Sequence, residues 1–123
     1  MKALIIDDSR AMRRLLSSLV SQHTQAETVE AEDGIYALEA LERHAPFDFA
    51  LVDWDMPRMS GLDFVRAVRA DPRYDELKLM MVTARNDGDD LSIAIEEGAD
   101  DFLMKPLSEA MVVDKLRILG LVG

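Results

Sequence analysis

Acidic side chains stand close together at two places in this chain of 123 residues. Asp7 and Asp8 form one pair, and Asp53 and Asp55 flank a tryptophan further along. Three carboxylates held at one point repel one another strongly unless a cation lies between them. Hard oxygen ligands in a small cluster suit Mg²⁺, which keeps several waters and binds through one or two carboxylates plus a phosphate. A magnesium site is therefore indicated if the fold brings Asp7, Asp8 and Asp53 together.

Two further side chains could act on a phosphate at such a site. Lys105 offers a positive charge to a phosphate oxygen, and Thr83 offers a hydroxyl donor. A carboxylate flanked by a metal ion and an ammonium group can attack phosphorus as a nucleophile, while both cations neutralise charge in the transition state. Any single aspartate is more simply explained as a turn residue, because Asp is common in loops. The chemistry therefore depends on all these groups meeting at one place.

The segments that must position these groups are short apolar runs, which alternate with stretches of helical period. We expect strands at residues 3–6, 28–31, 49–52, 79–82 and 102–104. The second run contains Glu30 and is predicted to be an edge strand. The third is apolar at every residue, which predicts a strand covered on both faces. Each strand except the edge strand is followed by a charged or hydroxyl group.

The predicted helices have recognisable ends. Ser9, Asp33 and Ser108 are placed as N-caps, and Gly98 is placed to end the fourth helix in a left-handed conformation. Strict alternation of strand and helix, five times over, predicts an α/β fold with a parallel sheet and helices on both faces. Ligands of such sheets bind beyond the carboxyl ends of the strands. The candidate residues lie at that rim.

Composition narrows the classes of function. The formal net charge is −10, which disfavours binding to nucleic acid because phosphate contacts need clustered Lys and Arg. The chain has no cysteine, which excludes disulfides and thiolate catalysis. The N-terminus turns acidic too early for a signal peptide, and no apolar run approaches the ~20 residues that span a bilayer. We expect a cytoplasmic protein with one domain, residues 1–123, that contacts neither nucleic acid nor membrane.

In order and spacing, the candidate residues resemble the signature of response-regulator receiver domains, the CheY-like domains of two-component phosphorelay signalling. The matching segments are Asp7-Asp8, Asp53-Trp54-Asp55-Met56-Pro57 with Gly61, Thr83-Ala84 and Lys105-Pro106. The resemblance covers nearly the whole chain. It implies a flavodoxin-like, doubly wound sheet of five parallel strands in the order 2-1-3-4-5, the order known for CheY itself. It also implies a cis peptide bond before Pro106.

The resemblance assigns a role to each group of the site. Asp53 would be the phosphoacceptor, and Lys105 would contact the phosphoryl group. Asp7 and Asp8 would form the acidic pocket for Mg²⁺, with the main-chain carbonyl of Asp55 as a further ligand. Such a domain is not an enzyme in the usual sense, because it catalyses only its own phosphorylation and dephosphorylation.

The resemblance also implies a switch and two kinds of partner. The phosphoryl donor would be a histidine kinase or a histidine phosphotransfer protein. Thr83 would be the switch hydroxyl and Phe102 the switch aromatic residue, which has no hydroxyl to donate. A downstream target protein would bind the face made by the fourth helix, the fifth strand and the fifth helix. Asp55 and Arg85 could tune the phosphoryl lifetime by closing over the site as an ion pair.

Two other functions remain open at this point. The Asp53-x-Asp55 pattern also resembles the nucleophile motif of haloacid-dehalogenase-type phosphatases, but these place the motif after an early strand and usually add a cap. Turnover of p-nitrophenyl phosphate would separate the two, because a receiver should barely support it. A flavodoxin-type FMN binder is the third possibility, and acids after the first strand would repel its phosphate. A colourless purified protein would exclude it.

Overall fold

The computed structural model of the chain describes residues 1–121, so the last two residues of the expected domain lie outside the described part. Its strands are β1 (Lys2–Ile6), β2 (Glu27–Ala31), β3 (Phe49–Asp53), β4 (Lys78–Thr83) and β5 (Asp101–Met104). Its helices are α1 (Arg10–Thr24), α2 (Gly34–His44), α3 (Gly61–Arg69), the short 3-10 helix η1 (Pro72–Tyr74), α4 (Gly88–Glu97) and α5 (Glu109–Ile118). None of the helices among these residues is long and apolar enough to cross a membrane.

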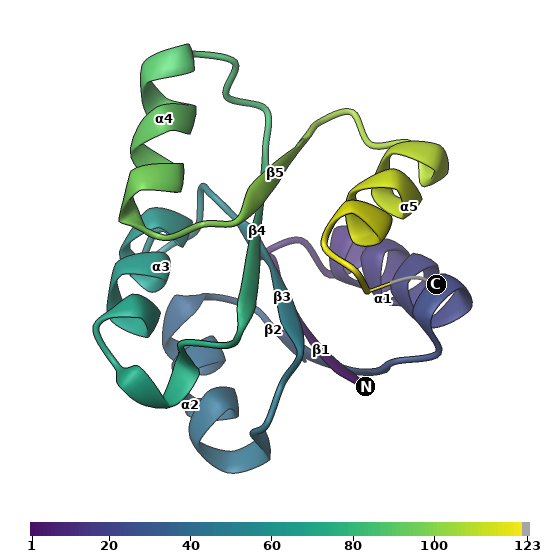
Figure 1. The fold of residues 1–123 in the computed structure, drawn as a ribbon, viewed down its shortest axis with the longest axis horizontal. Helices are drawn as coiled ribbons and strands as arrows, with labels where there is room; N and C mark the ends of the chain where they lie inside the picture. Colours follow the sequence, from purple (N-terminus) through teal and green to yellow (C-terminus); the bar gives the residue numbers. More distant parts are fainter. Residues whose placement is uncertain (122–123) are drawn as a thin grey trace.

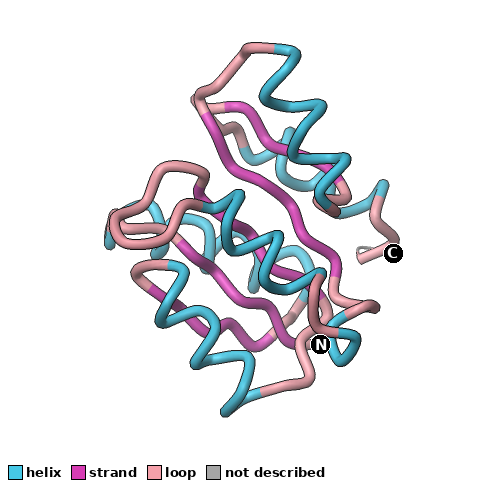
Figure 2. The backbone as a smooth tube through the Cα atoms, turned by 90° about the vertical axis from the view of Figure 1, so that its left-hand side faces the viewer, coloured by secondary structure: helices cyan, strands magenta, loops and turns pink. Residues whose placement is uncertain are grey.

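All neighbouring strands run parallel, in the order β2-β1-β3-β4-β5. The expected strands, the edge position of β2 and the strand order are therefore confirmed. Figure 1 shows α1 and α5 on one side of the sheet and α2, α3 and α4 on the other. Turned by 90°, the view in Figure 2 shows the strands running between these two helical layers. Covering both faces explains why every residue of β3 is buried.

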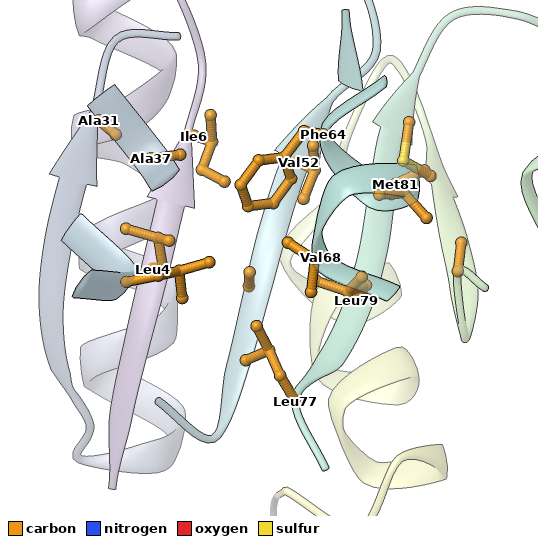
Figure 3. Close-up of a cluster of buried hydrophobic side chains, with 14 of the residues drawn as sticks. Leu4, Ile6, Ala31, Ala37, Val52, Phe64, Val68, Leu77, Leu79 and Met81 are labelled. Atoms are coloured by element: carbon orange, nitrogen blue, oxygen red, sulfur yellow. The ribbon is translucent and has the colours of Figure 1, made fainter. Parts of the chain in front are cut away.

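Alternate residues of each strand supply two separate cores, because successive side chains in a strand point to opposite faces of the sheet. Leu4 and Ile6 pack with Phe64 in the core on the α2, α3 and α4 side (Figure 3). Ala3 and Ile5 pack in the second core, beneath α1 and α5. Apolar burial on both faces holds the strands in register, so the residues just after the strands have defined positions.

Side-chain caps set where the helices begin. The hydroxyl of Ser9 accepts a hydrogen bond from the third residue of α1, and Ser108 does the same for α5. A carboxylate oxygen of Asp33 accepts from the third residue of α2. Gly98 ends α4 with a φ of 122°, a conformation that favours glycine. These caps were predicted, and those of Ser9, Asp33 and Ser108 start a helix within a few residues of the preceding strand end.

Gly61 closes the loop between β3 and α3. Its backbone N–H donates to the carbonyl oxygen of Trp54 at 2.7 Å. A Cβ atom at this position would lie 2.3 Å from the main-chain oxygen of Asp53 and 2.9 Å from the Cα of Trp54. Only glycine therefore allows α3 to start so close to the end of β3.

We predict that Gly61→Ala lowers the free energy of unfolding by about 1–3 kcal/mol or more, because the added methyl group meets backbone that cannot move aside. Gly88→Ala is the matched control, since within residues 1–121 a Cβ at that position would meet no atom within 4 Å outside its own helix and chain neighbours. In the first turn of α4 it should leave stability unchanged or raise it by up to about 1 kcal/mol. Urea denaturation of both variants measures this. Equal effects of the two substitutions would contradict the close approach.

Candidate functional site

Three carboxylates meet at the carboxyl ends of β1 and β3. Each of Asp7, Asp8 and Asp53 offers an oxygen, and these oxygens lie within 4.8 Å of one another. The sheet causes this, because β1 and β3 are parallel neighbours in which Ile6 pairs with Val52, and the acids follow directly. Asp7 and Asp53 are buried, whereas Asp8 is exposed. The structure thus brings together the three acids that the sequence singled out.

Asp7 has one oxygen held by the protein and one without a partner. Its Oδ1 accepts a hydrogen bond from the backbone N–H of Ser9 at 2.8 Å. Its Oδ2 is buried and has no hydrogen-bond partner among residues 1–121. Buried polar atoms are almost always paired, so an unpaired carboxylate oxygen needs an explanation. A cation among three carboxylates supplies one, and these hard oxygen donors fit Mg²⁺.

Lys105 brings a positive charge to the same rim from the other side. It follows β5, and its backbone N–H donates to the carbonyl of Thr83 at 2.8 Å. Its Nζ lies 3.2 Å from Oδ1 of Asp53. The peptide bond from Lys105 to Pro106 is cis, as the resemblance implied. Asp53 therefore lies between two carboxylates and an ammonium group.

The electrostatics of this cluster favour protonation of the buried acids. Burial, followed by the charge of Asp7, raises the pKa of Asp53 to about 6, although Lys105 opposes the shift. Burial also raises the pKa of Asp7, against the N–H of Ser9 and the charge of Lys105. At neutral pH the ionised cluster is therefore under repulsion, which a bound cation would relieve.

Thr83 ends β4 at the same edge of the sheet, and Phe102 lies within β5, the next strand along. Thr83 is buried, and its Oγ1 accepts the backbone N–H of Arg85 at 2.9 Å. Phe102 lies two positions before Met104, the residue that pairs with Thr83 in the sheet. It is partly buried and lines a shallow hollow together with residues of α4, including Leu91. Thr83 therefore lies between the acidic cluster and the strand that carries Phe102.

Arg85 makes more contacts than the sequence suggested. It donates to Oδ1 of Asp55 at 2.7 Å, the expected ion pair. It also donates to Oδ2 of Asp90 at 3.2 Å, and its guanidinium lies 5.0 Å from the ring centroid of Trp54. Sequence reasoning missed Asp90, which stands in the first turn of α4. The available signal was weak, because acids favour that turn of a helix in any case.

The side chain of Asp55 points away from the acidic cluster, since it is 68% exposed and pairs with Arg85. Its predicted role concerned the main-chain carbonyl instead. The role of that carbonyl as a metal ligand remains a prediction. The chemical roles of the other site residues remain predictions as well.

The chain matches a known family along almost its whole length. A family model described as the response regulator receiver domain matches residues 3–117. The chemotaxis protein CheY of Pseudomonas aeruginosa is 40% identical over 116 residues, which cover 94% of this chain and 93% of that protein. CheY1 of Helicobacter pylori (strain J99) is 35% identical over 118 residues, covering 96% and 95%. A solved structure of CheY4 of Vibrio cholerae superposes with a TM-score of 0.88 at 30% identity, covering 95% of this chain and 96% of that one.

The raised pKa of Asp53 leads to a prediction about stability without metal. A carboxyl group whose pKa is higher in the folded than in the unfolded state stabilises the fold while protonated, and that contribution is lost as pH rises through about 6. We expect Asp53→Asn to raise the free energy of unfolding at pH 8 by about 1–3 kcal/mol. The gain should shrink as pH falls through about 6 towards the ordinary value of 3.8.

Denaturant unfolding in a chelating buffer, repeated across this pH range, measures the difference. Asp114→Asn is the control, because that side chain is 68% exposed on α5 and should change stability by less than about 0.5 kcal/mol at every pH. A destabilised Asp53→Asn protein at pH 8 would show that the cluster is not under repulsion.

Proposed function

Because the chain belongs to the response regulator receiver domain family, we propose that Asp53 accepts a phosphoryl group from a phosphohistidine on a histidine kinase or histidine phosphotransfer protein. Membership makes the chain a CheY-like two-component signalling domain with a phosphoryl-accepting role. One observation carries the choice of residue. Asp53 is the buried carboxylate at the end of the central strand, 3.2 Å from the ammonium of Lys105 and beside two further acids.

The transfer would be a direct displacement at phosphorus. A carboxylate oxygen of Asp53 forms the new O–P bond, and the P–N bond of the donor breaks. The electron pair leaves with the imidazole nitrogen, which takes up a proton. Lys105 and the hydroxyl of Thr83 are placed to stabilise charge on the phosphoryl oxygens. Attack of water on the same phosphorus would return the free carboxylate, so the domain would act only on its own phosphoryl group.

The proposed cofactor is Mg²⁺, held by Asp7, Asp8 and Asp53 together with the main-chain carbonyl of Asp55. When bound, it would neutralise negative charge on the carboxylates and on the phosphoryl oxygens. Ser9 keeps Oδ1 of Asp7 engaged in a hydrogen bond, so the unpaired Oδ2 would be the oxygen that holds the ion. The support for this site is the partnerless buried oxygen and the spacing of the acids.

The signal would leave the site through Thr83. Its hydroxyl would donate to a phosphoryl oxygen, and the movement would leave space that Phe102 fills. Only contacts that differ between the two states can shift their populations, and Phe102 offers packing alone. The responding face would comprise α4, β5 and α5 and would bind a downstream target protein. A histidine kinase takes its phosphoryl group from ATP. We therefore propose that the protein acts in the cytoplasm.

The acceptor assignment predicts one labelled residue. Incubation with labelled acetyl phosphate and Mg²⁺ should give about one equivalent of acyl phosphate, which hydroxylamine removes. Asp53→Asn should take up none. Asp55→Asn is the matched control and should still be labelled. It removes a carboxylate two residues away that is 68% exposed, and it leaves the main-chain carbonyl in place.

A full equivalent of label on Asp53→Asn would refute the assignment. Steady release of phosphate from p-nitrophenyl phosphate by the wild-type protein would instead support the phosphatase. The family match over residues 3–117 favours the receiver.

The contacts of Arg85 lead to a prediction about the lifetime of the phosphoryl group. Arg85 is held by Asp55, by Asp90 and by the ring of Trp54, which directly follows Asp53. We propose that this arrangement hinders the in-line approach of water to phosphorus. Arg85→Ala should then lose its phosphoryl group about two- to fivefold faster than wild type, since exposed ion pairs are weak. Asp90→Asn removes one of the two carboxylates that hold Arg85 and should lie in between.

Single-turnover decay of the labelled protein with excess Mg²⁺ measures the lifetime. Arg66→Ala serves as the control, because this arginine forms ion pairs with Asp63 and Glu97, on α3 and α4, and has none with residues of the site. Unchanged or slower decay of Arg85→Ala would exclude the proposed shielding.

A further inference from the structure

The loop that follows Asp53 contains a strained residue. Among residues 1–121, two non-glycine residues have a positive φ, Gln25 at 59° and Arg58 at 67°. Gln25 ends α1, where a left-handed conformation is common. Arg58 lies in the middle of the loop of residues 54–60 and ends no helix. Such a conformation costs about 1–3 kcal/mol and persists only where the surroundings enforce it.

The side chain of Arg58 supplies that enforcement. Its Nε and Nη2 donate to Oδ2 of Asp33 at 2.8 and 2.6 Å. Its guanidinium lies over the ring of Tyr36, 5.1 Å from the centroid. The side chain of Asp33 is only 5% exposed, and its Oδ1 accepts the backbone N–H of Tyr36 at 3.0 Å. The tip of the loop is therefore bonded to the start of α2 by charge-assisted hydrogen bonds, which are the strong kind.

Asp33 is ionised in this arrangement. Burial by itself would raise its pKa, but the backbone N–H of Tyr36 and the guanidinium of Arg58 together hold the pKa below its ordinary value. The neighbouring residues add a close steric contact, because a Cβ at Gly34 would lie 2.8 Å from the side chain of Met59. Arg58 and Met59 thus both hold the loop against the first turn of α2.

The loop is fixed at its base as well. The N–H of Gly61 donates to the carbonyl of Trp54 at 2.7 Å. At the tip, the N–H of Met59 donates to the carbonyl of Pro57 at 2.7 Å, across Arg58. Asp55 lies between the fixed base and the fixed tip. Its carbonyl therefore has little freedom to change direction.

We infer that Arg58 is a positioning residue, which acts through Asp33 to hold residues 54–60 in the conformation that orients the carbonyl of Asp55 toward Mg²⁺. This inference rests on the proposed function, because it assumes that the ion binds at the acidic cluster. The physical reason is preorganisation: a loop that is already ordered loses less conformational freedom when the ion binds. Arg58 itself touches neither the ion nor the phosphoryl group.

Substitution of Arg58 can separate this role from simple stabilisation. Arg58→Gly removes the ion pair but also relieves the positive φ, so the two effects on global stability oppose each other. Asp33→Asn keeps an N-cap of similar quality for α2 and removes the charge. Arg58→Lys keeps the charge and the strain but loses the pair of guanidinium N–H groups that donate to Asp33. Arg73→Ala is the matched control, because Arg73, in η1, likewise forms ion pairs, here with Glu42 and Asp71, and its guanidinium lies 5.1 Å from the ring centroid of Tyr74.

Titration of the metal-free proteins with Mg²⁺, followed by the fluorescence of Trp54, the single tryptophan, gives the dissociation constants. Arg58→Gly and Asp33→Asn should raise the constant about three- to tenfold, and Arg58→Lys should raise it less. Arg73→Ala should match wild type. In acetyl phosphate reactions the Mg²⁺ concentration at half-maximal rate should rise by the same factor, whereas the rate at saturating Mg²⁺ stays close to wild type.

A second readout needs no metal at all. Amide hydrogens of residues 54–60 should exchange faster in Arg58→Gly than in wild type, while those of β3 remain protected. A dissociation constant for Arg58→Gly within about 1.5-fold of wild type would overturn the inference.

Asp8→Asn distinguishes that failure from failure of the proposed function. If wild type binds Mg²⁺ and Asp8→Asn does not, the proposed metal site stands whatever Arg58→Gly does. If wild type shows no Mg²⁺ binding, the metal site and this inference both fail.

Discussion

The mutual repulsion of buried carboxylates is the constraint around which the rest of this structure is arranged. The parallel pairing of β1 with β3 forces Asp7 and Asp53 to the same rim, and burial raises the pKa of Asp53 to about 6. The positive charge of Lys105 offsets part of the repulsion. What remains would be relieved by a cation, which is why we propose Mg²⁺ at this cluster. The two packed cores keep this unfavourable arrangement in place, because they fix the register of the strands.

The contacts at the two ends of α4 explain how this helix could respond to the site. Its carboxyl end is held by Arg69, which donates to the carbonyl of Gly98 at 2.9 Å and to that of Leu77 at 2.7 Å. Its amino end is joined to the site by the partly exposed ion pair of Arg85 and Asp90. Ala94 is its single buried residue. A helix fixed at one end and lightly held at the other can move without disturbing the core, which agrees with its place in the proposed responding face.

The fold was largely predictable because its signals are local. Apolar runs mark the strands, and Ser9 and Ser108 cap helices within three residues of themselves. The strand order came from the resemblance, since alternation alone leaves several topologies. The site acids were predictable because they directly follow strands. The pairing of Asp33 with Arg58 was not, because the two lie 25 residues apart and meet only through the conformation of a loop. The contact of Arg85 with Asp90 spans only five residues, and it was missed because an acid in the first turn of a helix is expected in any case.

The central claim is that Asp53 carries the phosphoryl group, and chemical trapping tests it most directly. Borohydride reduces an acyl phosphate of aspartate to homoserine, which marks the acceptor permanently. The protein would be phosphorylated with acetyl phosphate and Mg²⁺, reduced, digested and read by peptide mass spectrometry. The account predicts homoserine at position 53 and nowhere else. Homoserine at Asp7, Asp8 or Asp55, or a phosphoryl group that remains on a serine, threonine or histidine, would contradict it.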